Sequence, residues 1–180
     1  MRSFVVFTAT GSDRPGLANE FFEFFTARGM NIERTRGCVL GNEFGMIILT
    51  SGKTDDVERL INDVDGLRQR TGLEIHVRKT KAPSRREVQP SIPYKLIATS
   101  IDHPGIIHQI SKVLCRKGIN IDDISTNVDS NPVTGTNVFS MSCYFYLPPT
   151  IGIFELRKDL DHVSDQYNLD IRFDAVIHRL

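Results

Sequence analysis

The sequence predicts an α+β protein made of two similar modules in tandem, each with the element order β-α-β-β-α-β. The first observation is a repeat: Asp-Arg-Pro-Gly at residues 13–16 returns as Asp-His-Pro-Gly at residues 102–105. The second is that Gly-Met-Asn-Ile at 29–32 returns as Gly-Ile-Asn-Ile at 118–121, with the same offset of 89 residues. The third is that strand-like and helix-like hydrophobic periods follow one another in the same order in both halves. A fixed offset over separate segments is typical of a duplicated structural unit.

The first module opens with a strand and a helix. Residues 4–10 are a short apolar, β-branched run, which is typical of a buried strand. Residues 11–16 follow with Ser and Asp, which can accept hydrogen bonds from free helix N–H groups, and with Pro, which suits a first turn. A helix should therefore begin there and end near Gly29, since glycine readily adopts the left-handed conformation that closes helices. Its predicted buried face consists of Leu17, Phe21, Phe24 and Phe25.

Two strands, a second helix and a final strand complete the first module. Residues 32–40 and 44–51 are strand-like on either side of the Gly-Asn turn signal at 41–42. A single helix is predicted next, followed by a half-buried strand over residues 73–78, where apolar and polar residues alternate. The apolar face of that helix consists of Val57, Leu60, Ile61, Val64 and Leu67.

The second module repeats these steps. It begins with a strand at residues 95–100 and a helix that ends at Gly118. From Phe139 onward the offset grows to 95, so the hairpin at residues 129–137 should be about six residues longer than its counterpart. A second helix and a last strand follow, as in the first module.

The domain boundaries follow from the repeat and from one segment between its copies. Residues 80–93 carry three prolines and two adjacent arginines and predict an exposed linker, so the predicted domains are residues 1–79 and 94–180. Each domain should be ferredoxin-like, an antiparallel four-stranded sheet with both helices on one face. Such a sheet leaves its other face or an edge to be covered, and two linked copies can cover each other edge to edge or face to face.

Composition narrows the function classes. Lys+Arg and Asp+Glu number 22 each, so the positive and negative charges balance. A nucleic-acid-binding protein usually has a basic face or a high pI. No apolar run approaches 18 residues and no signal-peptide core is visible, so we expect a cytoplasmic protein. Cys38, Cys115 and Cys143 match no zinc or redox spacing and are expected to lie in or near the cores.

The repeated loop is the segment best suited to bind a ligand. It joins the first strand to the start of the first helix, where unpaired N–H groups and the helix dipole favour an anion such as a carboxylate. Gly16 and Gly105 lack a Cβ, so a ligand can approach the backbone closely. The alternative is a plain helix cap, which a duplicated fold would duplicate as well.

A strand followed by Asp-Arg-Pro-Gly, an apolar helix and Gly-x-Asn-Ile in this frame resembles the ACT domain, a regulatory amino-acid-binding module. Two such modules without a catalytic domain resemble the glycine cleavage system transcriptional repressor group, and residues 40–52 are similar to the first hairpin of that group. The resemblance implies a non-catalytic protein whose protein partner is a transcription activator, so that control of DNA is indirect. The balanced charge predicts no direct contact with nucleic acid, the lack of a long apolar run predicts no membrane association, and homo-oligomers stay open.

The resemblance also implies where a small amino acid, glycine or serine first, would bind. In the ACT family the site lies at the interface between two modules, with the loop on one side and a neighbouring strand on the other. One copy departs from the other, because His103 stands where the first loop has Arg14, and one of the two sites could be vestigial. The residues carried over are Asp13, Arg14, Pro15, Gly16, Asn31, Asp102, His103, Pro104, Gly105 and Asn120.

Two other function classes stay open from the sequence. A ferredoxin-like fold hosts many enzymes, but no nucleophile–base, P-loop or dinucleotide pattern is recognisable. The strand order also occurs in RNA-recognition folds, but the RNP aromatic signature is lacking. The remaining histidines show no metal-ligand spacing, and the acidic pair at 122–123 is better explained by a solvated strand start than by a cation site, so neither metal nor cofactor is expected.

Overall fold

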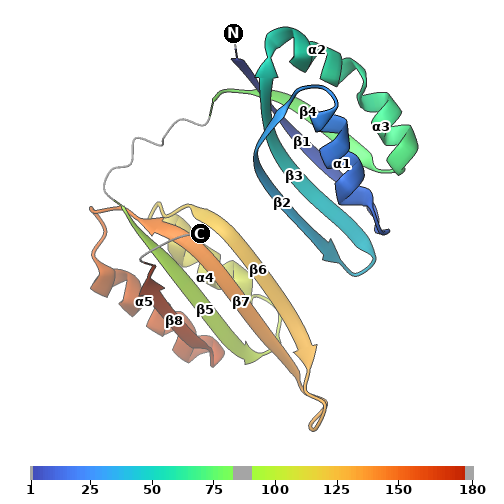
Figure 1. Cartoon of the computed structure of the whole chain (residues 1–180). Helices are drawn as coiled ribbons and strands as arrows, with labels where there is room; N and C mark the ends of the chain where they lie inside the picture. The colour runs from blue at the N-terminus through green and yellow to red at the C-terminus, as the bar shows by residue number, and fades with distance from the viewer. Residues whose placement is uncertain (1, 83–90, 177–180) are drawn as a thin grey trace. The chain divides into compact units, whose positions relative to one another are not determined.

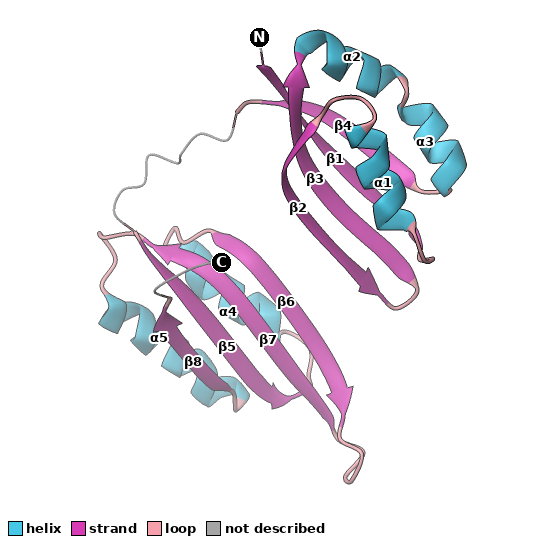
Figure 2. Cartoon of the chain, viewed as in Figure 1, coloured by secondary structure: helices cyan, strands magenta, loops and turns pink. Residues whose placement is uncertain are grey.

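The computed structural model describes residues 2–82 and 91–176. The chain divides into two compact units, Met1–Arg86 and Glu87–Leu180. Most of the predicted linker, its residues 83–90, lies outside the described residues. Both units have the predicted antiparallel four-stranded sheet with helices on one face (Figures 1 and 2).

The first unit has the sheet order β2-β3-β1-β4, so the first strand lies in the middle and is paired on both sides. Its α1 ends as predicted, with Gly29 left-handed at φ 67°. The elements of this unit are β1 (Arg2–Ser12), α1 (Leu17–Thr26), β2 (Asn31–Leu40), β3 (Glu43–Lys53), α2 (Thr54–Asn62), α3 (Val64–Thr71) and β4 (Glu74–Thr80).

The second unit has the equivalent sheet order, β6-β7-β5-β8. Its hairpin is longer, as predicted: six residues, 131–136, join β6 to β7, whereas residues 41–42 join β2 to β3. Asn131 organises the longer turn, because its side-chain Oδ1 accepts hydrogen bonds from the N–H groups of Val133 and Thr134. The elements of this unit are β5 (Ile92–Ile101), α4 (Ile106–Arg116), β6 (Ile121–Ser130), β7 (Asn137–Leu147), α5 (Ile153–Tyr167) and β8 (Asp170–Ala175).

One helix prediction is wrong: the single second helix of the first unit is two helices, α2 and α3, separated at Asp63. Asp63 ends α2 with φ −88° and ψ −1° and precedes the first residue of α3. Val64 and Leu67 are nevertheless buried, as the apolar pattern requires. The pattern of buried residues is therefore kept across the break, and periodicity alone does not reveal it.

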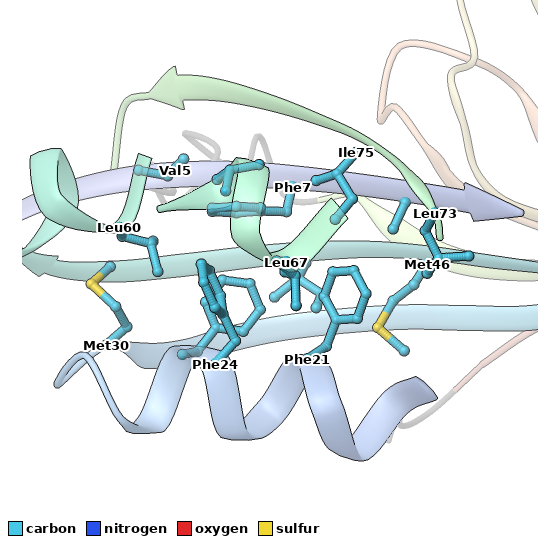
Figure 3. Packing of buried hydrophobic residues seen from close by; sticks show 14 of the residues in the cluster. Val5, Phe7, Phe21, Phe24, Met30, Met46, Leu60, Leu67, Leu73 and Ile75 are labelled. Carbon is cyan, nitrogen blue, oxygen red and sulfur yellow. The ribbon is translucent and has the colours of Figure 1, made fainter. Parts of the chain in front are cut away.

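Each unit has its own apolar core between sheet and helices. In the first unit the ring centroids of Phe7 on β1 and Phe25 on α1 lie 4.9 Å apart at 80°, an edge-to-face contact. Figure 3 shows Phe21 and Phe24 of α1 pointing toward the sheet. The core holds the helix against the strand, and it thereby fixes the loop between them.

Candidate ligand-binding loops

The first loop, residues 13–16, is held at both of its ends. At its start the N–H of Asp13 donates to the carbonyl of Asn42 in the β2–β3 turn at 2.8 Å. At its end Gly16 is the N-cap residue of α1, and its carbonyl accepts from the N–H of Glu20 at 3.0 Å. No side chain caps this helix, so the expected capping by Ser or Asp is wrong. Asp13 lies too early in the chain, three residues before the N-cap.

The second loop, residues 102–105, repeats this backbone. The N–H of Asp102 donates to the carbonyl of Asn137 at 2.9 Å, and the N–H of Gln109 donates to the carbonyl of Gly105 at 3.0 Å. Helix α4 also has no side-chain cap. Two loops with little sequence in common beyond Asp-x-Pro-Gly therefore present the same uncapped helix start.

The backbone conformation explains why both N-cap positions are glycine. Gly16 has φ 93° and Gly105 has φ 102°, values that L side chains rarely adopt. Space is not the constraint, because a Cβ on Gly105 would meet nothing within 4 Å, and one on Gly16 would meet only the Oε1 of Glu20 at 4.0 Å. The backbone is therefore exposed at the point where the free N–H groups of the first turn lie.

In the first loop, Arg14 is bound to an acid of the helix that follows, α1. Its guanidinium donates to both carboxylate oxygens of Glu20, at 2.6 and 3.1 Å, and Arg70 approaches the same carboxylate at 4.0 Å. Hydrogen bonding to Arg14 lowers the pKa of Glu20, and the same bond raises the pKa of Arg14. An anionic side chain, neutralised by arginine, thus lies next to the first loop.

The second loop lacks this acid. The position equivalent to Glu20 is Gln109, and His103 replaces Arg14. The ring of His103 stacks on Tyr167 with centroids 5.5 Å apart, and its Nε2 lies 3.2 Å from the carbonyl oxygen of Tyr167 at the end of α5. The side chain of His103 is therefore held against α5.

The two predicted asparagines do not join the loops within their own units. Asn31 begins β2, at the far end of α1 from Gly16, and ten helical residues span about 15 Å. Its Nδ2 donates to the Oε1 of Glu33 at 2.9 Å. Glu33 also accepts from Ser51 at 2.5 Å, and hydrogen bonds from Ser51 and then from Asn31 lower the pKa of Glu33.

Asn120 lies in a separate place, an open groove of about 610 Å³ along α4. Sequence reasoning missed this groove. Four of its lining residues on α4 recur at i, i+4, i+7 and i+8, a spacing that puts them on one face of the helix: His108, Lys112, Cys115 and Arg116. The groove is lined mainly by His108, Lys112, Cys115, Arg116, Asn120 and Ile121.

The cysteine prediction is wrong for two of three residues. Cys143 is buried in the second core, as expected, but Cys38 and Cys115 are exposed. Burial raises the pKa of the Cys143 thiol to about 11. Across the two described ranges, no group of three His, Cys, Asp or Glu side chains is arranged to hold a metal ion. Within the same ranges no helix is long and apolar enough to cross a membrane.

The comparison with protein families agrees with this geometry. Residues 3–78, the first unit from β1 to β4, match the ACT domain. The match covers the first unit alone, and the second unit repeats its topology, so the chain has two modules of this fold in tandem.

Individual proteins are also similar to this chain. Over 121 residues the chain is 27% identical to the glycine cleavage system transcriptional repressor of Escherichia coli K12, a match that covers 67% of this chain and 63% of that protein. It thus spans less than two thirds of that relative's length. A protein of unknown function from Galdieria sulphuraria has the same fold with a TM-score of 0.81 and 24% identity, over 98% of this chain and all of the other. A structure provisionally described as a glycine cleavage system transcriptional repressor has a TM-score of 0.73 and 21% identity, over 98% of each chain.

Proposed function

We propose that this chain is a non-catalytic regulatory protein that binds a small amino acid at its Asp-x-Pro-Gly loops and thereby changes its association with a protein partner. The observation that carries the proposal is the uncapped helix start at each loop, formed twice with the same backbone and with Gly16 and Gly105 at positive φ. The α-carboxylate would accept hydrogen bonds from the free N–H groups of the first helical turn. The exposed carboxylates of Asp13 and Asp102 supply the opposite charge for the α-ammonium.

Glycine and serine are the first ligands to test. The similarity to a glycine cleavage system transcriptional repressor supports a role in the control of amino-acid metabolism. The partner would then be a transcription activator, and control of DNA would be indirect. The two loops differ at this point, because Gln109 stands where the first loop has Glu20, whose carboxylate is neutralised by Arg14. We therefore expect the two loops to differ in affinity.

The test needs variants that repel a carboxylate without unfolding the helix. Asn19→Asp in α1 and His108→Asp in α4 each place an acid at the third residue of a helix, where the dipole favours it by about 0.3–1 kcal/mol. Both positions are exposed. The fold should be kept or slightly stabilised, while affinity for an amino acid at the altered loop falls. Asn62→Asp at the end of α2 is the charge control.

Thermal shift across the twenty amino acids identifies the ligand, and calorimetry on the variants locates it. The proposal expects one or two amino acids to stabilise the chain and expects Asn19→Asp and His108→Asp each to weaken binding at its own loop. Equal affinity in both variants and the control would show that the loops are helix starts only.

A further inference from the structure

The helices cover one face of each sheet, and the other face carries side chains that no described element of the same unit covers. Strand register assigns these side chains. In β1 the buried residues Val5, Phe7 and Ala9 face the helices, so the residues between them point to the open face. In β5 the buried residues Leu96 and Ala98 do the same.

In the first unit the open face is basic in its middle rows. One row across the four strands is Arg34, Leu49, Val6 and Arg78, and the next is Arg36, Ile47, Thr8 and His76. The three arginines are exposed, and none of them forms an ion pair with any residue that the structure describes. Ile47 between them is 47% exposed. We call these eight residues the basic sheet face.

In the second unit the equivalent row has the opposite charge at both edges. It reads Asp123, Tyr144, Lys95 and Asp174, so Asp123 stands where the first unit has Arg34, and Asp174 stands where it has Arg78. Lys95 lies over the ring of Tyr144, with its Nζ 5.3 Å from the centroid.

The neighbouring rows of the second unit add apolar surface and more acid. Ile97 is 42% exposed and Ile101 is 62% exposed, while Asp170 and Asp129 lie on the outer strands. Arg172 in the same area is bound to Asp170 at 2.9 Å. We call the surface formed by Asp123, Tyr144, Lys95, Asp174, Ile97, Ile101, Asp129, Asp170 and Arg172 the acidic sheet face.

We propose that the basic sheet face docks on the acidic sheet face of a second copy of this chain, and that the reciprocal contact closes a two-fold dimer. The carrying observation is the reversal of charge at both edges of one row, where Asp123 replaces Arg34 and Asp174 replaces Arg78. The neighbouring row, in which Ser125 and Arg172 stand where the first unit has Arg36 and His76, supplies an exposed isoleucine on each face. A protein partner fits better than single-stranded nucleic acid, because the centre of the basic face has Val6, Thr8, Ile47 and Leu49 in place of stacking aromatic rings.

The available area is sufficient for a stable dimer. Four strands about 4.8 Å apart, averaging between nine and ten residues at about 3.3 Å each, give roughly 600 Å² per face. Two reciprocal contacts bury roughly 2,400 Å² in total if fully covered, and half of that still reaches the size of specific interfaces. The proposal does not depend on the amino-acid function, because neither loop belongs to these faces.

The test uses two charge-reversed variants. Each should fail to dimerise alone, and the two should form a heterodimer when they are mixed. Arg34→Glu with Arg78→Glu makes both faces of the chain acidic, and Asp123→Lys with Asp174→Lys makes both basic. Mixing them restores two complementary contacts in the heterodimer. The control is Arg59→Glu with Arg70→Glu, since these exposed side chains lie on α2 and α3 at the helical face.

Sedimentation equilibrium gives the masses, and circular dichroism confirms folding of each variant. We expect the wild type and the control to reach the mass of two chains, with salt weakening the dimer. Each reversed variant should dissociate at least tenfold more readily, and the equimolar mixture should return to two chains. A wild type that is monomeric at every concentration, or a dimer indifferent to both reversals, would overturn the proposal. A mixture of folded variants that stays monomeric would overturn it as well.

Discussion

Replacing Gly16 by alanine tests the loop backbone on which the ligand site depends. Gly16 has φ 93°, and a Cβ there would meet only the Oε1 of Glu20, at 4.0 Å. The cost is therefore backbone strain alone, about 1–2 kcal/mol for an L residue held at positive φ. In a unit of this size each kcal/mol lowers the unfolding midpoint by about 4–8 °C.

Gly66 supplies the matched control in the same unit. It lies within α3, its φ is not positive, and a Cβ there would meet nothing within 4 Å. Gly66→Ala should raise the free energy of unfolding by about 0.5–1 kcal/mol, because alanine is the better helix former. Urea unfolding of the two variants should give opposite signs relative to the wild type. If Gly16→Ala is as stable as the wild type, the positive φ and the exposed helix start that we infer are wrong.

Three further predictions concern other parts of the molecule. A thiol reagent at pH 8 should modify exposed Cys38 and Cys115 rapidly and buried Cys143 only on unfolding, whereas three fast thiols would contradict the second core. Because its pKa is lowered, Glu33 contributes stability above its unfolded pKa of about 4.3 that is lost as the pH falls through the folded value. Ser51→Ala should raise the pKa of Glu33 measured by NMR, and an unchanged pKa would rule out the hydrogen bond as its cause. In a salt-titrated assay the chain should show no sequence-specific DNA binding at physiological salt, and specific binding would remove the case for indirect control.

The fold could be predicted from the sequence because its signals are local and doubled. Alternation in strands, the helical face with Leu17 and Phe21, and the closing Gly29 each describe one element, and the repeat confirms their order. The break at Asp63 was not predictable in this way, because Leu60 and Val64 are buried on either side of it.

The site was predicted only in part, for a spatial reason. The loop residues and the asparagines Asn31 and Asn120 are close in the repeat, but within a unit a whole helix separates them. Likewise, the opposition of Arg34 and Asp123 requires the strand register across a sheet, which no single segment reveals. Residues that share a sheet face can be far apart in the chain. The linear sequence therefore does not show that they form one charged surface.

Calorimetric titration of glycine and of serine into the purified chain tests the central claim most directly. A metabolite sensor needs a dissociation constant of about 10 μM to 1 mM, equivalent to roughly −4 to −7 kcal/mol. We predict saturable binding of at least one of the two in this range, with affinity reduced in Asn19→Asp combined with His108→Asp. No measurable heat at millimolar ligand, together with no stabilisation by any amino acid, would contradict the account.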